Sequence, residues 1–135
     1  MSYKDVRKLI QKMDFLCAYE RLKKINYSFC YTDLSKDFYG IKSTIMYMFL
    51  MYAISQEETV EKHLSICYYL YFEEPYANGS DSLIKLHLLR VLQLSPDNTS
   101  VLDNWVFGIY NGNPDCPFSD EELSAYHKRY KVRDR

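Results

Sequence analysis

The chain has 135 residues, of which 47% are apolar and 26% charged, and its formal net charge is −1. This length and composition predict a single domain that buries a core without metal or disulfide staples, and they exclude a disordered chain. They also exclude a membrane span, because the most apolar segment, residues 45–54, is about half the roughly 20 residues that a spanning helix needs.

Glycine and proline number four each, which favours long helices over a β-fold with many turns. The start of the chain, residues 1–10, is charged and has no signal-peptide cleavage pattern, so we expect a cytoplasmic protein. The cysteines form no C-x-x-C motif and have no histidine at ligand spacing, so no metal site, disulfide framework or cofactor is predicted. They are Cys17, Cys30, Cys67 and Cys116.

Hydrophobic periodicity predicts an all-α fold over residues 1–135, with about six helices in a bundle or a short α-solenoid. Apolar steps of three and four predict a first amphipathic helix over residues 3–25, bent midway. A turn-rich connection is expected over residues 26–35. A second helix, apolar nearly all round, is expected from residue 35 to residue 54, at the centre of the domain.

Capping patterns predict where the next two helices begin. Ser55 is followed three residues later by Glu58, a capping-box pattern that predicts a third helix starting there and ending before Pro75. Ser80 is expected to cap a fourth helix that runs to about Leu94.

The last two helices are separated by residues 111–117, where Gly and Pro interrupt the pattern. After them, Ser119 and Glu122 form a second capping-box pattern, which predicts a sixth helix. The basic segment 128–135 is predicted to be a frayed tail. The fifth helix carries apolar residues at helical spacing: Leu102, Trp105, Val106 and Ile109.

No motif in the sequence has the spacing of a catalytic site. A nucleophile elbow, a P-loop, an H-E-x-x-H pattern and a dinucleotide fingerprint are all absent from the sequence. His63, His87 and His127 fall in three separate predicted helices, and nothing in their spacing indicates a shared site. The sequence therefore predicts a protein that is not an enzyme.

Charge is distributed unevenly along the chain. Residues 1–42 carry nine Lys/Arg against five Asp/Glu, whereas residues 43–127 carry three against twelve. Residues 128–135 are basic again. The acidic middle would repel phosphate, so nucleic-acid binding is not expected, and it favours a basic protein partner instead.

Fourteen tyrosines are the unusual feature of the composition. Adjacent helical residues lie about 100° apart, so at least one of Tyr69 and Tyr71 is expected to be exposed or at a rim, near Glu73 and Glu74. Tyrosine rings and carboxylates together suit the binding of Arg or Lys side chains, since the rings provide contact area and cation–π sites and the acids provide ion pairs.

In size, charge and helical build, the chain resembles the immunity proteins that bacteria pair with toxins, including those of contact-dependent inhibition. The resemblance implies a protein that occludes the basic active site of a cognate toxin, such as a nuclease. The candidate partner-binding residues are Glu57, Glu58, Glu61, Tyr69, Glu73, Glu74 and Asp81.

Two alternatives stay open beside this interpretation. Glu57, Glu58 and Glu61 also suit the positive end of a helix dipole, which needs no partner. The segment 92–105, LQLSPDNTSVLDNW, resembles the turn between tetratricopeptide-type helical hairpins, which implies a helical-repeat adaptor or regulator that binds a peptide or protein.

Overall fold

The computed structural model describes residues 3–73 and 79–130. These residues form helices and no strands, which confirms the all-α prediction, although the helices number eight rather than six. This count takes α5 and the π-helix η1, which continues α5 directly, as one helix. In chain order the elements are α1 (Lys4–Gln11), α2 (Phe15–Lys24), α3 (Tyr31–Asp37), α4 (Ser43–Gln56), α5 (Val60–Tyr68), η1 (Tyr69–Glu73), α6 (Ser80–Leu94), the π-helix η2 (Leu102–Ile109) and α7 (Asp120–Tyr130).

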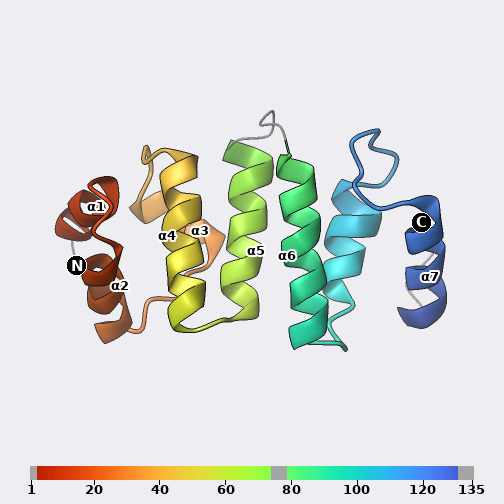
Figure 1. Cartoon of the computed structure of the whole chain (residues 1–135), viewed down its shortest axis with the longest axis horizontal. Helices are drawn as coiled ribbons and strands as arrows, with labels where there is room; N and C mark the ends of the chain where they lie inside the picture. The colour runs from red at the N-terminus through yellow and green to blue at the C-terminus, as the bar shows by residue number, and fades with distance from the viewer. Residues whose placement is uncertain (1–2, 74–78, 131–135) are drawn as a thin grey trace.

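The helices stand in a row along the long axis of the molecule (Figure 1). α4, α5, α6 and η2 lie side by side in chain order, with α1 and α2 at one end and α7 at the other. Only the short α3 leaves the row and covers one face of α4 and α5. Several pairs of consecutive helices are in contact, namely α1 with α2, α4 with α5, and α5 with α6, whereas α3 contacts α5.

The first predicted helix is two helices. The chain breaks at Met13, whose φ of 65° lies in the left-handed region. Asp14 then caps α2, and its carboxylate accepts a hydrogen bond from the backbone N–H of Cys17. Residue-by-residue periodicity did not show this break because Val6, Ile10, Ala18 and Leu22 are all buried and continue one apolar stripe.

The second predicted helix is also divided, into α3 and α4. α3 begins at Tyr31, inside the segment expected to be turns, and Gly40, with φ of 89°, makes the turn that follows it. The preceding loop is fixed to α5 by the Ser65 hydroxyl, which donates to the Phe29 carbonyl at 2.6 Å. Phe49 and Leu50 of α4 are fully buried, but α4 lies between the α1–α2 end and α5 rather than at the centre of the row (Figure 1).

The predicted start of the third helix at Ser55 is wrong. α4 continues through Gln56, and the Ser55 hydroxyl donates to the Tyr52 carbonyl within it. Thr59 is the N-cap of α5, and its hydroxyl accepts from the backbone N–H of Lys62 at 3.2 Å. Glu58, the acid that the expected capping box requires, contacts His63 and Arg90 instead of the Ser55 backbone.

The later boundaries agree better with the sequence. α6 ends at Leu94 as expected, although Ser80 is its first residue and Gly79, with φ of 84°, precedes it. The second capping box forms fully: the Glu122 N–H donates to the Ser119 hydroxyl at 3.1 Å, and the Ser119 N–H donates to the Glu122 carboxylate at 3.0 Å. α7 extends to residue 130, and the rest of the predicted basic tail, 131–135, lies outside the described residues.

One hydrophobic core runs along the row of helices. Its largest fully buried side chains include Trp105 and Tyr110 near η2, Phe49 on α4 and Phe38 after α3. Within residues 3–73 and 79–130, no helix combines the length and the apolar character needed to cross a membrane.

Candidate functional site

The structure brings only part of the predicted acidic surface together. Glu57 and Glu58 lie in the α4–α5 turn, Glu61 in the first turn of α5, Glu73 at the end of η1, and Asp81 in the first turn of α6. Glu74 lies outside the described residues. These carboxylates are spread along the molecule, so their individual contacts decide which of them a partner could reach.

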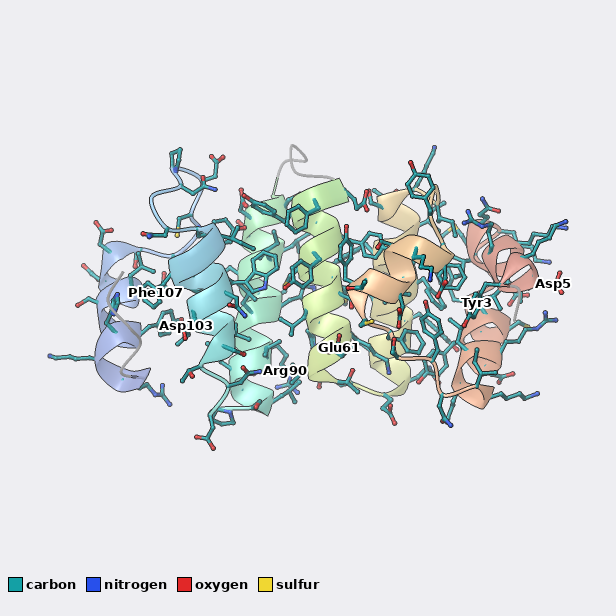
Figure 2. All side chains as sticks on the ribbon, turned by 180° about the vertical axis from the view of Figure 1, so that it is seen from behind. Tyr3, Asp5, Glu61, Arg90, Asp103 and Phe107 are labelled. Atoms are coloured by element: carbon teal, nitrogen blue, oxygen red, sulfur yellow. The ribbon has the colours of Figure 1, made fainter. Side chains whose placement is uncertain are left out.

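A groove between α3 and α5 holds the strongest combination of rings and charge. Tyr31 of α3 stacks on Tyr68 with ring centroids 5.3 Å apart, and Tyr68 stacks on Phe72 at 6.0 Å with an angle of 9° between the planes. These three rings and the exposed carboxylate of Glu61 line a groove of about 460 Å³, which we call the aromatic groove. Glu61 projects from α5 beside α3 (Figure 2).

Glu73 does not line the aromatic groove but is joined to it through Tyr31. Its carboxylate accepts a hydrogen bond of 3.0 Å from the Tyr31 hydroxyl, which joins α3 to the end of η1. Burial, and then this hydrogen bond, raise the pKa of Tyr31 to about 12, so its hydroxyl stays protonated and keeps donating. No lysine or arginine is among the described residues that line the groove. The groove is therefore negative, and Phe72, 54% exposed, gives it an open apolar wall.

Tyr69 is buried, which removes it from the proposed partner surface. Its side chain is 3% exposed and packs edge-on against Tyr31, with ring centroids 5.1 Å apart. Burial raises the pKa of its hydroxyl, which has no hydrogen-bond partner among the described residues. Tyr71 is the half-buried neighbour at the rim, as expected of one of the pair, and it packs against Trp105 and Tyr110. The π-helical turn of η1 decides which ring points inward.

Glu58 and Asp81 are already bound by other side chains of the same chain. Arg90 of α6 donates two hydrogen bonds to the Glu58 carboxylate, at 2.7 and 2.8 Å, and His63 contacts it at 2.7 Å. The hydrogen bonds from Arg90 and then from His63 hold the pKa of Glu58 at about 2. Asp81 accepts a hydrogen bond of 2.6 Å from the Tyr110 hydroxyl. These two acids hold helices together. Of the predicted acids, Glu61 lines the groove and Glu73 binds its Tyr31 ring.

Sequence spacing gave no sign of the buried pair of histidines. His63 on α5 and His87 on α6 are 5% and 3% exposed, and their Nδ1 atoms lie 2.8 Å apart. Glu58 is ionised and accepts only, so His63 Nε2 carries a proton and donates to it. The Nδ1···Nδ1 contact then holds one bridging proton, and a second proton there would set two N–H groups against each other. The pair can therefore carry at most one positive charge.

His87 is the less well hydrogen-bonded member of this pair. Its Nε2 has no hydrogen-bond partner among the described residues, and the ring of Tyr47 lies edge-on with centroids 6.0 Å apart. Burial, and then the charge on His63, lower the pKa of His87 to about 4. The two histidines are 24 residues apart and meet because α5 and α6 pack side by side. The sequence could have indicated the pair only if α5 and α6 had been aligned as a helical hairpin, which places His63 opposite His87.

Neither imidazole lines the aromatic groove, and the pair is closed in by α4, α5 and α6. Among the described residues, no group of three or more His, Cys, Asp or Glu side chains is placed to hold a metal ion. No protein-family model, curated protein or solved structure shows a significant match to this chain.

Proposed function

We propose that this chain is a protein-binding module whose aromatic groove takes a basic side chain of a partner, arginine above all. The observation that carries the proposal is the stack of Tyr31, Tyr68 and Phe72, which lines the groove together with the carboxylate of Glu61. A second carboxylate, that of Glu73, accepts a hydrogen bond from the Tyr31 hydroxyl. A guanidinium is planar, stacks on ring faces and pairs with carboxylates, so it matches both parts of this groove.

The groove is already assembled, which lowers the cost of binding. Tyr31 is held by Glu73 and by the edge of Tyr69, and Tyr68 packs against Trp105 with centroids 5.0 Å apart. A cation over such rings contributes about 0.5–2 kcal/mol, and the two carboxylates add attraction during the approach of the partner. Little side-chain entropy is lost when the rings are fixed in advance.

The partner that this charge pattern fits best is the basic active-site cleft of a toxin, which makes the chain an immunity protein of the kind paired with bacterial toxins. Residues 43–127 carry three Lys/Arg against twelve Asp/Glu, and the groove lies within α3 and this acidic region. An acidic surface seated in a basic cleft would fill the space where substrate phosphates bind, and like-charge repulsion would keep the module itself away from nucleic acid.

A helical-repeat adaptor is the second candidate, and the row of helices in chain order favours it (Figure 1). An adaptor would hold a peptide of its partner without blocking the partner's activity. The two functions therefore differ in what happens to the partner once it is bound, and not in where it binds.

The test is capture of the partner from the native host with the wild-type protein, with Glu61→Lys and with Glu20→Lys. Glu20 is an exposed carboxylate on α2 that does not line the groove, and it provides a matched change of charge. We expect one basic partner, retained by Glu20→Lys and reduced at least tenfold by Glu61→Lys. A partner retained equally by both variants would contradict the assignment of the groove.

The captured partner then separates the two functions. Stoichiometric loss of its toxic or nuclease activity on adding the wild-type chain, but not Glu61→Lys, supports the immunity function. Full activity in the complex supports the adaptor and excludes occlusion.

A further inference from the structure

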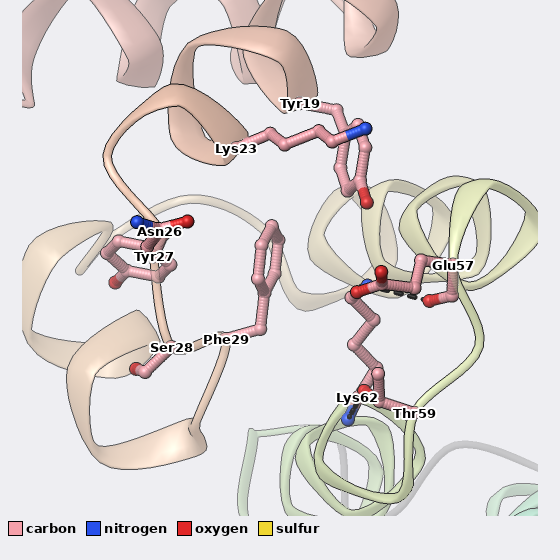
Figure 3. A pocket seen from close by; sticks show the side chains of 9 residues that line it. All are labelled: Tyr19, Lys23, Asn26, Tyr27, Ser28, Phe29, Glu57, Thr59 and Lys62. Atoms are coloured by element: carbon pink, nitrogen blue, oxygen red, sulfur yellow. Dashed lines mark hydrogen bonds and ion pairs between the residues drawn. The ribbon is translucent and has the colours of Figure 1, made fainter.

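Lys62 is buried at the edge of a second hollow, which α2, the 26–29 loop and the start of α5 line (Figure 3). Its side chain is 3% exposed, which is rare for lysine because the ammonium loses its hydration. Phe29 and Tyr19 flank it, with their ring centroids 5.0 and 5.4 Å from Nζ. The hollow thus joins two aromatic rings to one cation.

The ammonium of Lys62 has more donors than near partners. It donates to the Glu57 carbonyl at 2.6 Å, whereas the nearest carboxylate oxygen, Oε1 of Glu57, lies 3.7 Å away, beyond hydrogen-bond distance. The Glu57 side chain is 70% exposed and is free to turn toward solvent. An ammonium carries three N–H donors, so an anion entering the hollow could complete its coordination.

The hollow has the size of a small ligand. Its volume is about 260 Å³, slightly below the range typical of drug-sized ligands. A second cation, Lys23, stands at its rim. Burial lowers the pKa of Lys62, the nearby Glu57 opposes this shift, and the charge of Lys23 adds to it. Lys62 and Lys23 outweigh the single charge of Glu57, so the hollow favours an anion. The remaining polar groups at its rim belong to Asn26, Ser28 and Thr59.

We propose that this hollow binds a small organic carboxylate, with its carboxylate on the Lys62 ammonium in the place where the Glu57 carboxylate now lies, and its apolar body against Phe29 and Tyr19. The Glu57 side chain acts as an internal competitor that turns outward when the ligand enters. The inference does not depend on the aromatic groove, which takes a cation.

Benzoate is the probe, and benzamide, its neutral analogue of the same shape, is the matched control ligand. Each is titrated into the labelled full chain, and the backbone amide shifts of Phe29, Thr59 and Lys62 are followed by NMR. We expect saturable shifts with benzoate, at a Kd on the order of 1 mM for a ligand this small, and none with benzamide. Equal binding of the two would overturn the proposal, because the site would then read shape and not charge.

Three variants test the roles of the side chains. Lys62→Met is expected to abolish benzoate binding, and Lys24→Met, an exposed lysine on α2, to leave it unchanged. Glu57→Gln is expected to tighten binding about fivefold, since a competing charge at contact distance in a solvated site is removed. Unchanged binding to a folded Lys62→Met protein, or weaker binding to Glu57→Gln, would contradict the proposal. If Lys62→Met does not fold, the Glu57→Gln and benzamide results decide.

Discussion

Acidification from about pH 7 to about pH 4 is expected to destabilise the fold through the buried His63–His87 pair. In the unfolded chain each histidine takes up a proton near its ordinary pKa of about 6.5. In the fold, the 2.8 Å contact between the Nδ1 atoms allows the pair one positive charge at most, and burial lowers the pKa of His87 to about 4. The unfolded state therefore binds more protons than the folded state throughout this window, so stability falls as pH falls.

The size of the effect follows from the shift. A pKa lowered from about 6.5 to about 4 corresponds to roughly 3 kcal/mol, present above pH 6.5 and lost progressively as pH falls toward 4. That is a large part of the 5–15 kcal/mol typical of a domain. Below about pH 4.5 Glu58 adds a further loss of stability, because its pKa is held at about 2 in the fold while the unfolded chain already begins to protonate it.

The assay is urea unfolding followed by circular dichroism at several pH values between 7 and 4, on the wild type and on His87→Asn. Asparagine keeps a polar atom near Nδ1 but does not titrate, so the variant should lose most of the wild-type slope between pH 6.5 and 4.5. His127→Asn is the control, because the His127 ring packs against Phe107, with ring centroids 4.1 Å apart, and has no part in the pair. Equal slopes for wild type and His87→Asn, or a His87 NMR titration near pH 6.5 in the folded protein, would refute the reasoning.

Three further substitutions test local features of the fold by chemical unfolding. Thr59→Ala should lower the free energy of unfolding by about 1 kcal/mol because it removes the N-cap of α5, whereas Ser55→Ala should lower it by under about 0.5 kcal/mol. The reverse order would indicate that Ser55 forms the capping box predicted from the sequence. Gly108→Ala should lower the free energy of unfolding by about 2 kcal/mol or more, since an added Cβ would lie 2.6 Å from the Asp103 carbonyl oxygen in η2. An unchanged unfolding midpoint would mean that η2 does not have this π-helical turn. Tyr69→Phe should be neutral or stabilising by up to about 1 kcal/mol, because the buried hydroxyl has no hydrogen-bond partner among the described residues, and a clear loss of stability would reveal one.

The sequence predicted features that depend on a few adjacent residues and missed those that depend on contacts across the fold. The capping box of Ser119 and Glu122 formed because both of its hydrogen bonds lie within one helical turn. The pattern at Ser55 was equally good locally, but α4 continues through it to Gln56, and Glu58 binds Arg90, a residue far away in the sequence. Helix breaks such as the one at Met13 interrupt no apolar stripe, and so they left the helix count too low.

The candidate site shows the same limit. The clustering of tyrosines and acids near the end of α5 was visible in the sequence. Glu61 does line the aromatic groove, and Glu73 accepts a hydrogen bond from one of its rings, Tyr31. The third ring, Tyr31, comes from α3, a helix that the sequence placed among turns. Which of Tyr69 and Tyr71 is buried depends on the π-helical turn of η1, and helical periodicity assumes an α-helix.

The most direct test of the groove's function is an NMR titration of the full chain with a short blocked peptide, acetyl-Gly-Arg-Gly-amide, against the same peptide with citrulline in place of arginine. Citrulline keeps the planar shape and removes the charge. We expect saturable shifts at Tyr31, Tyr68 and Phe72 with the arginine peptide, no such shifts with the citrulline peptide, and none in Glu61→Lys. Shifts of equal size with both peptides, or shifts with arginine that avoid the groove, would contradict the proposed function of the groove.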